Sequence, residues 1–336
     1  MSTSAAPSSA SSSSSPRPSR RRLLAGGAGL ALGASAGALV PSAPAAAAEP
    51  ASAALFPLKP PHLLEAETLV DYLRLRADQW DHNRYDAAGE DLGETAVTWG
   101  RPGHPEEFEN LSQCASFMTL LLQRTYGAGT AYGWATRAYF DQYFPRKDGR
   151  PRASSSQPTA EDLQAGFRNA ADVPHFDPVT KPVNLRPGDI VAWDYDPGAR
   201  SAPYTGHTVL IRAYLGTYPS SVDDQLGIPG VVPHLFQIID CTSNPHGGPT
   251  LTSRASIDRY RAHPDTRATV TDGPDVVYDE KNGVGYGHMV FYAHPDTSLF
   301  AGYRWSLNSS SPEPAVAEPV SGRKQIAAGR VNAFVV

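Results

Sequence analysis

Hydrophobic positions recur at helical spacing in the first half of the chain and at strand spacing in the second half. In the clearest helical segment, Ser112 can cap a helix over residues 113–126 and Gly127 can end it. After residue 185, short β-branched and aromatic runs alternate with turns, which predicts strands. The predicted helices are 63–80, 113–126, 131–143 and 161–169, and the predicted strands are 190–193, 208–214, 235–240, 276–278, 288–292 and 325–335.

Helices followed by an antiparallel sheet are typical of the α+β class, in which the helices pack on one face of the sheet. The polar segments 81–111, 145–158 and 306–319 are predicted to be loops between these elements. No internal repeat divides the chain. The pattern therefore predicts a single domain over residues 62–336.

The N-terminus has the pattern of an export signal. Residues 1–22 are rich in Ser, Ala and Pro and end in Arg20-Arg21-Arg22, and a weakly apolar Gly/Ala run follows. This predicts a twin-arginine-type signal peptide over residues 1–48, cleaved before Glu49, and a Pro/Ala-rich tether over 49–61. A membrane anchor is the alternative, but glycine-rich stretches insert poorly. We expect a secreted protein, with the cell wall as one place of action and no stable membrane association after cleavage.

Composition narrows the function classes. The 336 residues are 40% hydrophobic and include only 2 cysteines, which excludes a disulfide-framework miniprotein and a zinc ribbon. Removing residues 1–48 takes away four arginines and no acidic residue, so the net charge falls from −5 to −9. An acidic chain is a poor binder of phosphate backbones, so nucleic acid is not an expected partner.

A set of residues suited to nucleophilic catalysis stands at the ends of the predicted elements. Cys114 lies in the first turn of a helix, where free N–H groups and the helix dipole favour the thiolate. His207 begins a predicted strand and could act as its base, and the next strand ends in Asp240, which could orient the imidazole. Asn244 is the reserve candidate for this third role, and His288, in a similar Gly-His segment, is the rival base.

Three fragments in this order resemble papain-like cell-wall cysteine hydrolases, the NlpC-type peptidases and the CHAP amidases. The fragments are Gln113-Cys114-Ala115-Ser116-Phe117, then Leu185-Arg186-Pro187-Gly188-Asp189-Ile190-Val191, then Gly206-His207-Thr208-Val209-Leu210-Ile211. The Gln-Cys pair is closer to the CHAP pattern. The resemblance implies a papain-like fold, with N-terminal helices on an antiparallel sheet, and a triad of Cys114, His207 and Asp240 or Asn244.

The oxyanion donors are only partly assigned by the sequence. The backbone N–H of Cys114 is one expected donor, because the N-terminus of a helix favours a developing negative charge. Tyr85 and Gln113 are both open as the second donor. The chain has no His-Glu-x-x-His motif and no phosphate-cradling glycine loop, so no metal or cofactor is expected.

The leading hypothesis is a secreted cysteine hydrolase that cleaves amide bonds in peptidoglycan stem peptides, as an endopeptidase or an amidase. The peptidoglycan or muropeptide substrate comes from the resemblance alone. The alternative is a non-catalytic secreted binding protein on the same scaffold, in which Cys114 and Cys241 form a disulfide bond. The sequence leaves open the bond cleaved, the choice between water and an amine as acyl acceptor, and the oligomeric state.

Overall fold

The central strands are buried on both faces. Strand β10 (Gly283–Ala293) is buried at every one of its 11 positions, and β5 (Ile190–Asp194) is buried along its whole length. A strand with helices on one face and solvent on the other alternates between buried and exposed residues. Both faces of these strands are therefore covered by protein.

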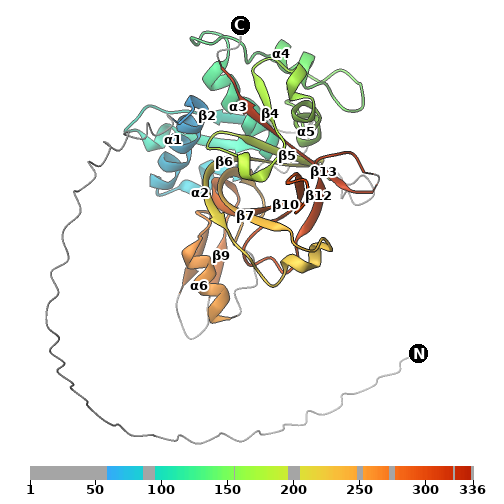
Figure 1. Ribbon diagram of the computed structural model, residues 1–336. Coiled ribbons are helices and arrows are strands. Elements are labelled where there is room, and N and C mark those ends of the chain that lie inside the picture. The colour runs from blue at the N-terminus through green and yellow to red at the C-terminus, as the bar shows by residue number, and fades with distance from the viewer. Residues whose placement is uncertain are drawn as a thin grey trace, which may run out of the picture. The chain divides into compact units, whose positions relative to one another are not determined.

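The computed structural model (Figure 1) describes residues 59–85, 95–154, 156–195, 205–247, 253–271, 277–320 and 322–333. The expected signal peptide and the expected tether up to residue 58 lie outside these ranges. The helices are α1 (Pro61–Leu75), α2 (Gln79–His82), α3 (Cys114–Tyr126), α4 (Arg137–Tyr143), α5 (Ala160–Arg168) and α6 (Arg254–Ala262). The remaining strands are β1 (Asn83–Tyr85), β2 (Ala96–Thr98), β3 (Glu109–Ser112), β4 (Phe176–Val179), β6 (Gly206–Thr217), β7 (Val232–Thr242), β8 (Ala268–Thr271), β9 (Val277–Glu280), β11 (Phe300–Arg304), β12 (Glu313–Val316) and β13 (Lys324–Val331).

The large sheet closes into a seven-stranded barrel. Its strand order is β12-β11-β10-β7-β6-β5-β13, and β13 pairs back onto β12 in parallel, with β4 added at the outer side of β13. The expected papain-like arrangement of helices on an antiparallel sheet is therefore wrong, because a closed barrel is not that fold. Irregular pairing in β6, between Ile211 and Ala213 and between Tyr214 and Gly216, adds the local twist and bending that help a sheet to close.

The two faces of the barrel wall carry different cores. Alternate residues, such as Val209, Phe236 and Phe291, pack against one another inside the barrel. The residues between them, such as Leu210 and Ile239, pack against helices on the outside. Helix α3 contacts β6 and β7, and α5 contacts β5 and β13. The helices thus cover the outer face of the barrel wall, and the other face is the barrel interior and not solvent.

Several elements differ from the predicted ones. The predicted loop 81–111 contains β1, β2 and β3, which form a separate small sheet in the order β1-β3-β2. Strands of three or four residues are too short to display a period, which explains why the pattern missed them. The same holds for the four-residue strands β4, β8 and β12. Strand β11, of five residues, and α6, a short polar helix, were also missed. Figure 1 shows α6 and β9 side by side in a lobe that projects from the barrel.

Among the described residues, no helix combines the length and the apolar character needed to cross a bilayer.

Candidate functional site

Cys114 is the first residue of α3 and is 6% exposed. Strand β3 leads directly into this helix, and the backbone N–H of Gln113 donates to the Ser116 hydroxyl at 2.9 Å as part of a capping box. The cap fixes the first turn, whose N–H groups have no partner within the helix. The sulfur therefore lies where the helix terminus stabilises a negative charge.

His207 is the second residue of β6 and faces the barrel interior, on the same side as Val209. Its ring contacts two tryptophans, Trp193 with centroids 5.2 Å apart and Trp305 with centroids 4.9 Å apart. The preceding residue, Gly206, has to be glycine because a Cβ there would lie 2.0 Å from the Trp193 carbonyl oxygen. Close pairing of β5 and β6 thus fixes the backbone from which the imidazole projects.

Asp240 lies near the end of β7 and is completely buried. The Nε2 of His207 donates to Asp240 Oδ2 at 2.7 Å. Since Nε2 is used in this way, Nδ1 is the ring nitrogen left for Cys114, whose thiol is close enough to His207 for each group to shift the pKa of the other. The structure thus brings together Cys114, His207 and Asp240 from α3, β6 and β7 in one buried chain of interacting side chains.

The electrostatics of this chain favour charge separation. Burial by itself raises the pKa of the Cys114 thiol, but the charge of His207 and hydrogen bonds from His207 and Thr208 lower it below its ordinary value. Burial by itself lowers the pKa of His207, but Cys114 and Asp240 raise it to about 9. Burial opposes ionisation of Asp240 too, yet Arg267 and the two neighbouring histidines hold the pKa of its carboxyl well below the usual range. The shifts of Cys114 and His207 thus favour the charged forms, a thiolate beside an imidazolium.

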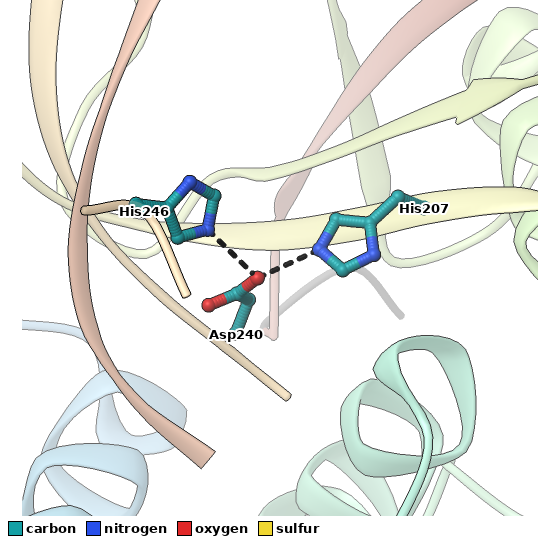
Figure 2. A group of neighbouring side chains, drawn as sticks. All are labelled: His207, Asp240 and His246. Carbon is teal, nitrogen blue, oxygen red and sulfur yellow. Dashed lines mark hydrogen bonds and ion pairs between the residues drawn. The ribbon is translucent and has the colours of Figure 1, made fainter. Parts of the chain in front are cut away.

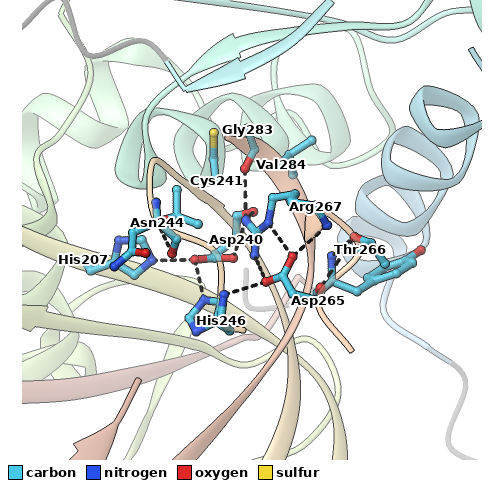
Figure 3. A network of polar contacts seen from close by, with 12 residues as sticks. His207, Asp240, Cys241, Asn244, His246, Asp265, Thr266, Arg267, Gly283 and Val284 are labelled. Carbon is cyan, nitrogen blue, oxygen red and sulfur yellow. Dashed lines mark hydrogen bonds and ion pairs between the residues drawn. The ribbon is translucent and has the colours of Figure 1, made fainter. Parts of the chain in front are cut away.

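Three residues that the sequence analysis did not single out surround Asp240 (Figures 2 and 3). His246 Nε2 lies 3.0 Å from the same oxygen, Oδ2, that accepts from His207. Arg267 pairs with the other oxygen, Oδ1, at 2.9 Å and with Asp265 at 2.7 Å. In the sequence, the one feature that could have indicated a role for any of these three residues was the position of His246, six residues after Asp240 in the polar turn that follows β7.

The side chains of His207, Asp240 and His246 are also close enough to be considered as metal ligands, since their donor atoms lie within 4.8 Å of one another. However, the two nitrogen-to-oxygen distances, 2.7 and 3.0 Å, have the length of N–H···O hydrogen bonds. The carboxylate is also paired with the Arg267 guanidinium, which would repel a cation bound at Asp240. The arrangement fits a hydrogen-bonded network better than a metal centre.

The other predicted site residues lie nearby in different roles. Asn244 lines the pocket next to His207, but its backbone, not its side chain, is hydrogen-bonded to Thr242, and the carboxylate against His207 belongs to Asp240. Tyr85 lines the same pocket, and Gln113 caps α3. Both stay open as oxyanion donors.

His288, the rival base, lies on β10. Its ring packs against His263 with centroids 5.3 Å apart, and its Nδ1 lies 3.2 Å from the Pro264 carbonyl oxygen. Burial, with a smaller contribution from His263, lowers the pKa of His288 to about 4. The residue that interacts with the thiol of Cys114 is His207, and not His288.

Both cysteines are free thiols. Cys241 points to the helix side of the barrel wall, where its thiol donates to the Ser112 carbonyl at 3.1 Å. Burial raises the pKa of Cys241 to about 12. The structure therefore lacks the Cys114–Cys241 bond of the binding-protein alternative, and its two sulfurs differ in acidity.

A pocket of about 250 Å³ opens onto His207. Aromatic side chains form part of its wall, and small polar residues at the end of β7 form another part. The lining residues are Tyr85, Tyr195, Gly206, His207, Thr242, Ser243, Asn244 and Trp305. These lining residues include no Asp, Glu, Lys or Arg, so beyond His207 the pocket presents polar and aromatic groups to a substrate.

Comparisons with protein-family models, with curated proteins and with solved structures found no match for this chain. The function is therefore inferred from the geometry of the site.

Proposed function

We propose that this protein is a secreted cysteine hydrolase that cleaves amide bonds, with peptidoglycan stem peptides as its substrate class. The observation that carries the proposal is the buried set of Cys114, His207 and Asp240, in which Cys114 interacts with His207 and His207 is hydrogen-bonded to Asp240. A nucleophile, a base and a residue that orients the base are the three parts that covalent acyl transfer requires. The substrate class is supported by the motifs around Cys114, Asp189 and His207 and by the export signal.

The proposed reaction has two steps. The Cys114 thiolate adds to the carbonyl carbon, and the His207 imidazolium gives its proton to the leaving amine as the C–N bond breaks. His207 then takes a proton from water, whose oxygen adds to the thioester carbon, and the thiolate leaves with the carboxylic acid released. Asp240 stays ionised throughout and holds the imidazole in the required orientation.

The test compares the two cysteines. Cys114→Ala is expected to abolish the release of new amino groups from purified peptidoglycan and soluble muropeptides, because it removes the thiolate that attacks the carbonyl carbon. Cys241→Ser is the matched control, since a serine hydroxyl can replace the thiol that donates to Ser112. It is expected to retain activity.

A second measurement tests the activated thiol independently of the substrate class. Iodoacetamide at pH 6–8 is expected to label Cys114 and to leave Cys241, with its raised pKa, unlabelled. Rapid labelling of Cys114 without cleavage of wall material would refute the proposed substrate class, whereas the proposal of an activated thiol would stand. Full hydrolytic activity in Cys114→Ala would refute the proposal as a whole.

A further inference from the structure

His246 makes four contacts that together fix its ring and its charge. Its backbone N–H donates to Asp265 Oδ2 at 2.8 Å, and its Nδ1 lies 2.6 Å from the carbonyl oxygen of Trp305. Its Nε2 lies 3.0 Å from Asp240 Oδ2. The ring is stacked on the Trp305 indole, with centroids 4.0 Å apart and an angle of 26° between the planes. The side chain is completely buried.

The hydrogen bonds determine the protonation state of this ring. A carbonyl oxygen and a carboxylate oxygen both only accept, so each ring nitrogen of His246 has to donate. A neutral imidazole has one N–H and would place a lone pair against one of the two oxygens. The doubly protonated imidazolium satisfies both, and an indole face within 4.0 Å stabilises a cation further.

The balance of buried charge agrees with this assignment. Asp240 and Asp265 are carboxylates, and Arg267 contributes a single positive charge between them. All three side chains are completely buried. The charges of the His207 imidazolium and the Cys114 thiolate cancel each other, so without a charged His246 the buried groups would hold one uncompensated negative charge. A buried net charge is strongly unfavourable, and the imidazolium removes it.

We propose that His246 is a positioning residue of the site, which as an imidazolium holds Asp240 Oδ2 against His207 and leaves the buried cluster neutral. Its catalytic consequence rests on the proposed function, whereas its charge state does not. Because two imidazolium-forming rings share one carboxylate oxygen, the charge of His246 also opposes a second positive charge on His207. His246 thereby limits how strongly Asp240 holds the proton of His207.

The charged and titratable groups that face His246 come from several elements. Asp240 and His207 lie on β7 and β6, Asp265 and Arg267 lie between α6 and β8, and His288 on β10 lies behind them with a pKa lowered by burial. At neutral pH His288 is therefore uncharged and does not compete with His246.

The test uses nuclear magnetic resonance of protein labelled with ¹⁵N-histidine. At pH 8, where an ordinary histidine is mostly neutral, both ring nitrogens of His246 are expected to be protonated, the signals being assigned by their loss in His246→Gln. One protonated and one unprotonated nitrogen would overturn the proposal. Unprotonated Nε2 atoms on both His246 and His207, restored to N–H by a chelator, would instead indicate a metal site and would also overturn it.

The same samples test the coupling to His207. In His246→Gln the amide can still donate to Asp240 but carries no charge, so the titration midpoint of His207 is expected to rise by about one pH unit. His234→Gln is the control. His234 is a buried histidine on β7, the strand of Asp240, and its ring contacts Tyr214 instead of Asp240. A midpoint that stays unchanged or falls in a folded His246→Gln variant would refute the coupling. These signals need no substrate, so this test and the hydrolysis test can fail independently.

Discussion

The carboxylate of Asp240 connects the side chains of the site. Its oxygen Oδ2 contacts two histidines, His207 and His246, and its oxygen Oδ1 pairs with Arg267. Replacing it by Asn keeps the shape and removes the charge that supports the His207 imidazolium. We expect Asp240→Asn to lower kcat by about 10⁴-fold, as loss of the orienting carboxylate does in serine-protease triads.

The pH profile gives the sign of this effect. Asp240 and Cys114 together raise the pKa of His207 from 6.5 to about 9, so hydrolysis is expected to decline above about pH 9 as the proton for the leaving amine is lost. In Asp240→Asn this decline should begin at lower pH, the opposite direction to His246→Gln. Asp223→Asn is the control, because the Asp223 carboxylate accepts a hydrogen bond from Tyr292 and does not contact His207. In this variant the decline of activity is expected at the same pH as in the unchanged protein. An unchanged profile in Asp240→Asn would contradict the assigned role.

The triad residues could be proposed from the sequence because each marks the end or the start of a regular element. Cys114 begins a helix, His207 begins a strand, and Asp240 lies near the end of the next strand. His246 and Arg267 could not be found in this way, since they lie in irregular segments where no period relates one residue to another. Their proximity to Asp240 depends on loop geometry that pattern analysis does not contain.

At the scale of single elements, strand β10 packs against the polar network around Asp240 through Gly287, which lies next to His246 and Asp265. A Cβ at Gly287 would lie 2.5 Å from His246 Cδ2 and 3.0 Å from Asp265 Oδ2, so glycine is required there for the ring to fit. We expect Gly287→Ala to displace His246, to change its ring-nitrogen signals and to lower kcat/KM.

The matched control for this variant lies on another strand. A Cβ at Gly329 on β13 would lie 2.5 Å from a ring carbon of Phe167, an equally severe overlap in the core beside α5. Both variants should lose stability, but only Gly287→Ala should alter the His246 signals. Equal effects of the two variants on hydrolysis, at equal loss of stability, would show that β10 has no particular role in the site.

Most long elements were predicted to within a few residues, as for the helix that begins at Cys114 and the strands that became β5 and β13. The closure of the sheet was not. A run such as Gly283–Ala293 shows that a strand avoids water, but not whether its second face meets another layer or the far wall of the same sheet. Closure depends on β13, which pairs with β12 and also with β5, and the β5 pairing joins residues far apart in the chain, such as Ala327 and Ala192. A local pattern carries no record of that pairing.

At the scale of the whole molecule, the barrel interior is a second core, and its contribution to stability can be measured. Ile326 on β13 is completely buried in it, whereas Val320, a few residues earlier, is half exposed. We expect Ile326→Ala to lower the free energy of unfolding by about 2–5 kcal/mol, and Val320→Ala to change it by less than about 0.5 kcal/mol. Urea unfolding provides the comparison, and similar small losses for both would argue against a packed interior.

The strands of the barrel are joined unequally. Strand β7 pairs with β10 over 11 residue pairs, whereas β12 is joined to β11 and to β13 by two residue pairs each. In mechanical terms β12 is the weakest stave of the ring, because its release breaks the fewest backbone hydrogen bonds. The staves that carry His207 and Asp240 lie away from it, side by side, so a ring opened at β12 would still keep the base and its carboxylate together.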